Sequence, residues 1–257
     1  QWIGERFFAR TPVLVNEGLP LLGTFAGMLV IVALGLWDDV RGLTPRVKLA
    51  GQIVAAAMPI AAGLRVVYVG NPFQGGLLQL GLLGIPVTLV WIVGFTNVIN
   101  LIDGLDGLAA GVTGIAAISF LVLAAQMNQL VAAVFAAAVI GACVGFLRYN
   151  FHPASIHMGD SGAMFLGFTL STLALQGVMK SVAAVTLVVP LLVIGVPVFD
   201  TLSAIIRRML HGRPIQEADD GRIHHRLLRR GFDQRQTVLI IYVWSAALAV
   251  GGYSMRL

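Results

Sequence analysis

The sequence predicts an all-α polytopic membrane protein, and three observations support this fold class. Of the 257 residues, 58% are hydrophobic and only 11% are charged. A soluble domain of this length needs a charged shell, which 12 acidic and 17 basic side chains are too few to form. The apolar composition also excludes a disordered chain, and a single cysteine, Cys143, excludes a disulfide-stapled secreted domain.

Eight apolar runs in the sequence are each predicted to form a membrane-spanning helix. A helix needs about 20 mostly apolar residues to cross the hydrocarbon core of a bilayer. The runs lie at about 19–37, 49–69, 77–99, 107–125, 130–147, 161–179, 181–199 and 237–253. We expect a single membrane domain over residues 1–257. Since the chain begins with Gln1 and has no signal-peptide pattern, we expect it to be N-terminally truncated, with further spans upstream.

The charged residues predict an orientation for these helices. Twelve of the 17 Lys and Arg residues fall on the side that the chain reaches after its first run. By the positive-inside rule this side is the cytoplasm. The pI near 10 therefore reflects membrane orientation, and we expect no nucleic acid partner. Ten of the 12 acidic residues lie on the same side, although acids do little to set orientation, so they predict a site there.

The first inside connection, about residues 38–48, holds adjacent carboxylates. Asp38 and Asp39 directly follow an apolar run, and their mutual repulsion raises the pKa of one or calls for a cation. Lys48, nearby in the sequence, is a candidate phosphate ligand. The alternative is a structural pair that caps the next helix or binds Arg41 and Arg46.

The second connection, about 97–107, places polar residues at helical spacing. Asn97, Asn100 and Asp103 are three residues apart, as are Asp103 and Asp106. Their oxygens are the donor type that suits Mg²⁺. The alternative is an N-cap followed by a glycine-rich packing seam.

The third connection, about 148–162, ends in a short motif at the start of a span. Asp160 lies within Gly-Asp-Ser-Gly, where helix-terminal N–H groups and a carboxylate together fit a metal–phosphate unit. A simple N-cap gives the same pattern.

The fourth connection, about 200–236, is the longest and is rich in arginine. Its cations include Arg222, His224, His225 and Arg226, a density that suits a phosphate or pyrophosphate. Binding of anionic lipid together with a topology signal is the alternative for the arginines. Adjacent histidines without further His or Cys nearby do not predict zinc.

Taken together, the four connections resemble the polyprenyl-phosphate N-acetylhexosamine-1-phosphate transferases, membrane enzymes that start bacterial cell-envelope glycans. The matching motifs are the Asp-Asp pair at 38–39, Asn-x-x-Asn-x-x-Asp-Gly-x-Asp-Gly at 97–107, Gly-Asp-Ser-Gly at 159–162 and His-His-Arg-Leu at 224–227. The resemblance extends from about residue 20 to the C-terminus, and it implies ten or more membrane spans in the whole protein, the eight of this chain and about two upstream.

The resemblance implies a reaction, a cofactor and a location. In this family a polyprenyl phosphate attacks the β-phosphate of a UDP-sugar and UMP is released. The implied cofactor is Mg²⁺, with Mn²⁺ as a substitute, and the implied location is the bacterial inner membrane with the active site facing the cytoplasm. The implied partners are undecaprenyl or decaprenyl phosphate, the UDP-sugar and the lipid bilayer, and we also expect a homodimer.

The resemblance also implies roles for individual residues. Asp160 would be a Mg²⁺ ligand with Asn100 and Asp103 nearby. The implied catalytic residues are Asp38, Asp39, Asp103, His224 and His225, and the implied substrate-binding residues are Lys48, Asn97, Asn100, Asp106, Arg222 and Arg226. Two positions depart from the family pattern, because Arg222 stands where a histidine is common and Gly42 where an acid is common.

The fourth motif discriminates between substrates within the family. It resembles the branch that uses UDP-N-acetylglucosamine more than the phospho-N-acetylmuramoyl-pentapeptide transferases, which carry three consecutive histidines there. From a different class, an ion-coupled transporter would also hold intramembrane carboxylates, but the sequence has no inverted repeat and its acids gather at one face. A non-catalytic membrane scaffold would leave the Asn and Asp pattern without a cause.

Overall fold

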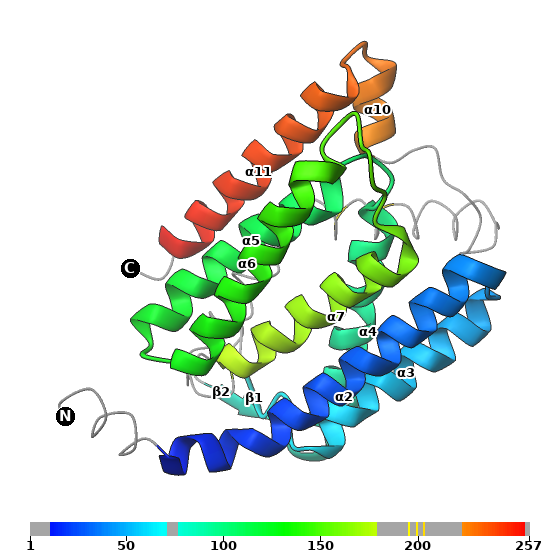
Figure 1. Ribbon diagram of the computed structural model, residues 1–257. Helices are drawn as coiled ribbons and strands as arrows, with labels where there is room; N and C mark the ends of the chain where they lie inside the picture. Colours follow the sequence, from blue (N-terminus) through cyan, green and yellow to red (C-terminus); the bar gives the residue numbers. More distant parts are fainter. Residues whose placement is uncertain are drawn as a thin grey trace, which may run out of the picture.

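The computed structural model describes residues 11–70, 77–178, 195, 199, 203 and 223–254, and these residues are predominantly helical (Figure 1). The α-helices are α2 (Thr11–Arg41), α3 (Pro45–Ala61), α4 (Gly84–Ile102), α5 (Leu108–Gln126), α6 (Leu130–Asn150), α7 (Gly159–Val178), α10 (Ile223–Arg229) and α11 (Gln234–Ser254). The predicted all-α membrane class is confirmed. Seven of the eight apolar runs correspond to helices, and the run at 181–199 lies outside the described residues apart from two isolated positions.

Five of the described helices are long and apolar enough to cross a bilayer. They comprise residues Gly18–Arg41, Gly81–Ile102, Leu108–Gln126, Leu130–Asn150 and Gln234–Gly252. At 1.5 Å per residue, the 19 residues of α5 extend about 28 Å, close to the thickness of the hydrocarbon core. Helix α3, with 17 residues, is shorter than these five. The chain is a multi-pass membrane protein.

The predicted run at 49–69 is wrong in its boundaries. Helix α3 begins earlier, at Pro45, and ends at Ala61. Gly63 follows with a φ of +100°, a left-handed conformation that ends helices and that glycine adopts without strain. The chain then forms a strand, β1 (Tyr68–Gly70), whose residues cannot be part of a spanning helix.

The predicted run at 77–99 is also displaced. It begins with strand β2 (Leu77–Gln79), which pairs antiparallel with β1, so that Val69 lies opposite Leu78. A short 3₁₀ turn, η1 (Gly81–Leu83), leads into α4. The backbone N–H of Val66 donates to the Thr88 hydroxyl at 2.9 Å and thereby attaches the hairpin to α4. Apolar composition alone did not distinguish these strand residues from helix.

Helix α5 lies at the centre of one of two hydrophobic clusters. Its buried residues are mostly small, and it packs on α6, α7 and α11. The second cluster joins α2, α3 and α7 around Ile31, Ala55 and Phe168, all fully buried. In Figure 1, α2 and α3 lie side by side, with α7 between them and the α5–α6 pair. Helix α7 therefore connects both clusters.

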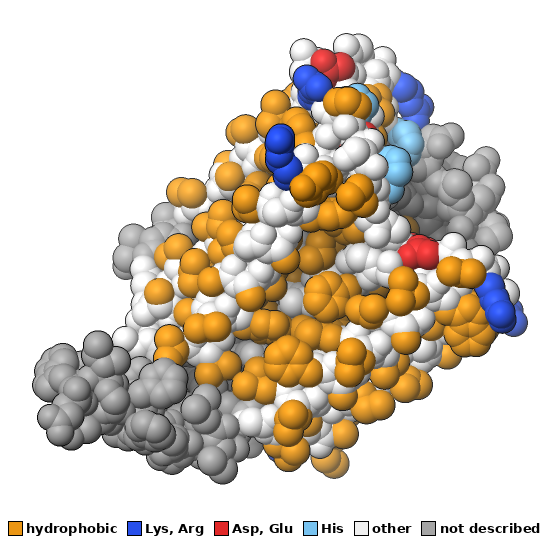
Figure 2. All heavy atoms as spheres, viewed as in Figure 1, with side chains coloured by type: hydrophobic (Ala, Val, Ile, Leu, Met, Phe, Trp, Pro, Cys, Tyr) orange, Lys and Arg blue, Asp and Glu red, His pale blue; other side chains and the backbone are white. Residues whose placement is uncertain are grey.

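Charged side chains gather at one end of this helical assembly. Among the side chains that the structure describes, eight of nine Lys and Arg and all six Asp lie near the α2–α3 turn, the α4–α5 turn, the α6–α7 connection or α10 and the start of α11; Arg65 is the exception. Figure 2 shows the charged and histidine side chains on that end and hydrophobic side chains along the rest of the visible face. This distribution agrees with the segregation expected from the sequence.

Candidate active site

Lys48 joins three helices at the charged end. Its ammonium nitrogen lies 2.8 Å from a carboxylate oxygen of Asp38 and 2.9 Å from one of Asp160. Asp38 is near the end of α2, Lys48 is in the first turn of α3, and Asp160 is in the first turn of α7. Only 8% of the Asp38 side chain and 18% of the Lys48 side chain are exposed, so this ion pair is shielded from solvent. The predicted phosphate ligand is therefore already engaged with two predicted site carboxylates.

The two adjacent carboxylates of α2 have different partners. Asp38 Oδ1 accepts a hydrogen bond from the Leu43 backbone N–H at 2.6 Å, within the α2–α3 turn. Asp39 reaches a different helix: its two oxygens accept the backbone N–H groups of Asp160 at 2.7 Å and Ser161 at 3.1 Å. The alternative that this pair caps the next helix is wrong, because the N-cap of α3, Thr44, has no side-chain cap hydrogen bond and the backbone N–H that Asp38 accepts belongs to the turn before α3. Asp39 instead caps α7.

Close packing brings Asp39 to α7. A Cβ atom on Gly35 would lie 2.3 Å from the Ser161 Cα, so only glycine lets α2 approach α7 this closely. Gly159 has a φ of +67°, and a Cβ there would lie 3.0 Å from the Asp39 carboxylate. The glycines flanking both acidic motifs therefore allow Asp39 to reach the N-terminus of α7.

Asn100, from the last turns of α4, completes the contacts of Asp160. Its amide nitrogen donates to Asp160 Oδ1 at 2.5 Å, while Asp160 Oδ2 binds Lys48. Asp160 is the most accessible member of the group, with 37% of its side chain exposed. The predicted residues Asp38, Asp39, Lys48, Asn100 and Asp160 thus form one connected cluster, called the Asp160 cluster below.

Asp103 is the C-cap residue of α4 and lies beside the Asp160 cluster. Burial, together with the negative charges of Asp160 and, to a smaller extent, of Asp106 and Asp39, raises the pKa of the Asp103 carboxyl to about 6. His157 acts in the opposite direction. An acid with this pKa changes its charge close to neutral pH, and a cation placed beside it would favour the ionised form.

Asp106 holds the connection between α6 and α7. One carboxylate oxygen accepts hydrogen bonds from His152 Nδ1 at 2.8 Å and from the Ala154 backbone N–H at 3.1 Å, while the other lies 3.7 Å from His157 Nδ1. Burial raises the pKa of Asp106, but the hydrogen bonds and the neighbouring histidines outweigh burial and lower it. In this geometry Asp106 organises residues 152–157.

Asn97 pairs with a residue of α3. Its amide nitrogen donates to Gln52 Oε1 at 2.6 Å, and Gln52 Nε2 donates back to Asn97 Oδ1 at 3.3 Å. Gln52 is almost fully buried. This reciprocal amide pair connects α3 to α4 one helical turn from Asn100. Asn97 is thereby set apart from the Asp160 cluster, and its predicted role in substrate binding stays a prediction.

The fourth motif is only partly described. Arg222 and the side chain of His224 lie outside the described residues. In α10, Leu227 is buried against the core cluster, whereas Arg226 is exposed. The Arg235 Nε donates to the His152 carbonyl oxygen at 2.9 Å, so the start of α11 is attached to the loop that Asp106 organises. The predicted roles of His224, His225, Arg222 and Arg226 stay predictions.

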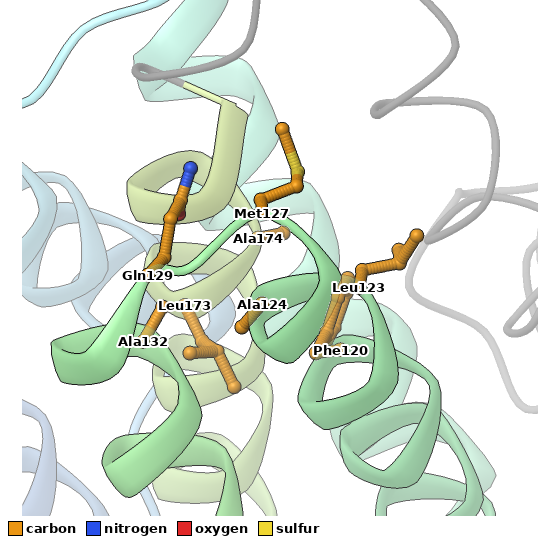
Figure 3. A pocket seen from close by; sticks show the side chains of 8 residues that line it. All are labelled: Phe120, Leu123, Ala124, Met127, Gln129, Ala132, Leu173 and Ala174. Carbon is orange, nitrogen blue, oxygen red and sulfur yellow. The ribbon is translucent and has the colours of Figure 1, made fainter.

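A small apolar pocket lies at the opposite end of the helices. Figure 3 shows its lining side chains, which come from the last turns of α5, the start of α6 and the second half of α7. They are Phe120, Leu123, Ala124, Met127, Gln129, Ala132, Leu173 and Ala174. Asp160 lies in the first turn of α7 and Asp103 at the C-terminal end of α4, before the start of α5, so this pocket is separate from the charged groups.

Comparison with known proteins identifies the family. The profile of glycosyl transferase family 4 matches residues 21–178, more than half of the chain. The chain belongs to glycosyl transferase family 4. The matched segment holds the entire Asp160 cluster, together with Asp103 and Asp106.

Several curated members of this family are similar over most of the chain. A probable undecaprenyl-phosphate N-acetylglucosaminyl 1-phosphate transferase of Bacillus subtilis is 44% identical over 217 residues, which cover 84% of this chain and 61% of that protein. A decaprenyl-phosphate N-acetylglucosaminephosphotransferase of Mycolicibacterium smegmatis is 37% identical, covering 93% and 64%. A phospho-N-acetylmuramoyl-pentapeptide-transferase of Desulforudis audaxviator is 34% identical, covering 96% and 80%. The chain spans somewhat less than two thirds of the length of the first two relatives.

The donor set of this family 4 chain fits a magnesium ion bound together with its substrate. Among the described residues, no three His, Cys, Asp or Glu side chains are grouped so as to hold a metal by themselves. Mg²⁺ is, however, commonly held by one or two carboxylates, with water and substrate phosphates completing its octahedron. Asp160, Asp103 and the amide oxygen of Asn100 are hard donors of this kind.

Sequence reasoning missed several residues of this family 4 site. Gln52 lies within an apolar run, and no spacing rule connects it to Asn97. Asn150 is buried; its side chain accepts the Gly107 N–H at 3.0 Å and donates to the Ile156 carbonyl at 2.9 Å. His152 and His157 both precede the third motif, and their position in the same connection as Asp160 was the signal that could have found them.

Proposed function

We propose that the chain transfers N-acetylglucosamine 1-phosphate from UDP-N-acetylglucosamine to a polyprenyl phosphate and so starts a cell-envelope glycan. The observation that carries this proposal is the Asp160 cluster. It places a lysine, carboxylates and an amide at the charged end of apolar helices, where a membrane lipid and a soluble nucleotide can meet. Relatives that are 44% and 37% identical are named for this type of transfer, to undecaprenyl and decaprenyl phosphate.

The reaction requires little covalent chemistry from the protein. A phosphate oxygen of the lipid forms a bond to the β-phosphorus of the UDP-sugar. The bond from that phosphorus to the oxygen bridging the two phosphates breaks, and UMP leaves with that oxygen. Because the second pKa of a phosphate monoester is near 6, the attacking oxygen is largely ionised at neutral pH. The protein must mainly position two anionic groups and offset their repulsion.

The cluster residues supply these functions in our proposal. Lys48 contributes a cation that Asp38 and Asp160 hold in place, close to where the pyrophosphate would lie. Asp160, Asp103 and Asn100 would hold Mg²⁺, which when bound would neutralise charge on the pyrophosphate. Mn²⁺, with the same preference for oxygen ligands, is the substitute. His224, His225, Arg222 and Arg226 of the fourth motif would bind the nucleotide phosphates.

We further propose that the charged end faces the cytoplasm of a bacterial inner membrane. The excess of Lys and Arg at that end supports this orientation. UDP-sugars are made in the cytoplasm, so this orientation gives the site access to its nucleotide substrate. A homodimer stays a prediction from the resemblance.

A second substrate is favoured by one specific observation. The phospho-N-acetylmuramoyl-pentapeptide-transferase of Desulforudis audaxviator is 34% identical, and the match covers 80% of that protein, more than for the other two relatives. The reaction type is the same in both proposals, and only the sugar nucleotide differs. The three relatives named above are all transferases, and none of them is named as an ion-coupled transporter.

Purified protein of natural length, incubated with undecaprenyl phosphate and Mg²⁺, tests the proposal. We expect UDP-N-acetylglucosamine to give a lipid-linked product and one equivalent of UMP, with much less product from UDP-N-acetylmuramoyl-pentapeptide. The Asp160→Asn variant should lose most of the activity while still inserting into membranes. Product from the pentapeptide nucleotide alone would establish the second substrate, and no product from either would refute the transferase proposal.

A further inference from the structure

Asp39 is in an unusual position for a residue of an active-site motif. Both of its carboxylate oxygens are occupied by backbone N–H groups of another helix, those of Asp160 and Ser161. These donors belong to the first turn of α7, where N–H groups have no partner within the helix. Asp39 thus performs for α7 the function of an N-cap residue, although it is 121 positions away in the sequence.

This contact fixes the backbone that carries Asp160. The Asp160 N–H is held by Asp39 from α2, and the Asp160 side chain is held by Lys48 from α3 and Asn100 from α4. Without the Asp39 contact, the first turn of α7 would keep its side-chain partners but would lose two backbone hydrogen bonds to a charged acceptor. Such bonds are stronger than neutral ones, and a helix N-terminus also favours a nearby negative charge.

The neighbouring Asp38 does not share this arrangement. Asp38 contacts Lys48 and the Leu43 backbone, and its interaction with α7 is with the Asp160 side chain and not with the backbone N–H groups of the first turn. The two adjacent carboxylates therefore bind different groups: Asp38 binds the Lys48 ammonium, and Asp39 binds the N-terminus of α7.

We propose that Asp39 is a positioning residue, which acts on the reaction only by holding the first turn of α7 and with it Asp160. This inference deepens the proposed function and rests on it for the role of Asp160. The resemblance counts Asp39 among the catalytic residues, but a carboxylate that already accepts two N–H groups at 2.7 and 3.1 Å is used as an anchor for α7.

The test compares Asp39→Asn with Asp39→Ala. Asn keeps one oxygen that accepts one of the two N–H groups, whereas Ala keeps none. We expect about a tenfold loss of kcat for Asp39→Asn and about a hundredfold loss for Asp39→Ala, the effect of losing one and two charge-assisted hydrogen bonds. The pH profile of kcat/KM should keep its shape in Asp39→Asn, because no proton acceptor has been removed.

Hydrogen–deuterium exchange of the substrate-free protein gives a readout that does not depend on activity. We expect faster exchange of the peptide covering residues 159–162 in Asp39→Ala, and a smaller increase in Asp39→Asn. Asp233 provides a matched control, since it caps α11: Asp233 Oδ1 accepts the Gln236 N–H at 2.7 Å, and Gln236 Oε1 accepts the Asp233 N–H at 3.1 Å. Asp233→Ala should speed exchange at the start of α11 and leave residues 159–162 unchanged.

Two results would overturn the inference. One is unchanged exchange of residues 159–162 in Asp39→Ala. The other is equal inactivity of Asp39→Asn and Asp39→Ala with loss of the acidic limb of the pH profile, which would make Asp39 a proton acceptor. If the unaltered protein transfers no sugar phosphate, the proposed function fails by itself, and the exchange measurement still decides whether Asp39 holds α7.

Discussion

At the scale of single residues, the site is built from acids whose surroundings give them different charge states. Asp106 is surrounded by donors that lower its pKa, whereas burial raises the pKa of Asp103 to about 6. The two residues are three positions apart and were indistinguishable in the sequence. Their difference arises from the burial of Asp103 and from the loop at 150–158, which places His152 and Ala154 against Asp106.

The raised pKa of Asp103 predicts a pH-dependent effect on stability. An acid with a pKa higher in the folded state than in the unfolded state lowers stability as pH rises between these two values, here from about 4 to about 6. Asp103→Asn removes the buried charge. We therefore expect the variant to have a higher thermal midpoint than the unaltered protein at pH 7.5, with the difference disappearing at about pH 4.

Thermal unfolding in detergent without divalent cations measures this effect. Asp106→Asn serves as the control, since the lowered pKa of Asp106 gives the opposite sign and the variant should be less stable at pH 7.5. An equal midpoint gain for Asp103→Asn at both pH values would contradict the assignment of a buried, charged Asp103.

The site residues differ in how far the sequence could predict them. Asp38, Asp39, Lys48, Asn100 and Asp160 were all selected by type and spacing, and the fold brings all five together. What the sequence could not predict was their partners. The contact of Asp39 with α7 depends on the close approach of α2 at Gly35, and such a tertiary approach has no local signal.

At the scale of the elements, hydropathy located the helices but not all of their ends. Helix α3 and the beginning of α4 were displaced because the segment between them forms a hairpin from residues that are equally apolar. Periodicity does not separate a short buried strand from a helical segment. The left-handed Gly63 marks the end of α3, but glycines are also frequent inside the helices of this chain.

The contact between α5 and α11 predicts that adding one methyl group to α5, by Gly111→Ala, lowers the stability of the protein. The Tyr242 hydroxyl of α11 donates to the Gly107 carbonyl oxygen, and a Cβ on Gly111 would lie 1.9 Å from the Tyr242 ring. Gly111→Ala must therefore separate the two helices or displace the tyrosine. We expect a loss of about 1–3 kcal/mol, the usual cost of overpacking.

Gly141→Ala in α6 is the matched control for this effect. A Cβ on Gly141 has no atom within 4 Å, so the substitution adds the same methyl group without a clash. Thermal midpoints of both variants, measured in the same detergent, should fall only for Gly111→Ala. If the thermal midpoint of Gly141→Ala fell by a similar amount, the loss of stability in Gly111→Ala would come from replacing a helical glycine and not from the α5–α11 contact.

At the scale of the whole molecule, the charged residues lie at one end of the helical assembly, and four helices meet there to form one site. Helices α2, α3, α4 and α7 each contribute one or two residues to the Asp160 cluster, and all of these residues lie at one end of the assembly. The cluster combines three carboxylates, those of Asp38, Asp39 and Asp160, with the single ammonium of Lys48, so the cluster residues alone carry a net negative charge. In our proposal a bound divalent cation would offset this charge before an anionic substrate binds.

The same separation predicts how the molecule is oriented in a membrane. Eight of the nine described Lys and Arg lie at the charged end, and the positive-inside rule assigns that end to the cytoplasm. Cys143 is the single cysteine of this sequence. It is buried, and replacing it by alanine leaves an introduced cysteine as the only thiol of this sequence that a maleimide can label. Arg230→Cys reports on the charged end and Leu130→Cys, 55% exposed at the start of α6, on the other end.

A membrane-impermeant maleimide applied to sealed, right-side-out vesicles should label Leu130→Cys and not Arg230→Cys. Inside-out vesicles should give the reverse, and solubilised protein should be labelled at both positions, which controls for reactivity. Labelling of Arg230→Cys from the outside would invert the orientation, and the Asp160 cluster would then open away from the compartment in which UDP-sugars are made.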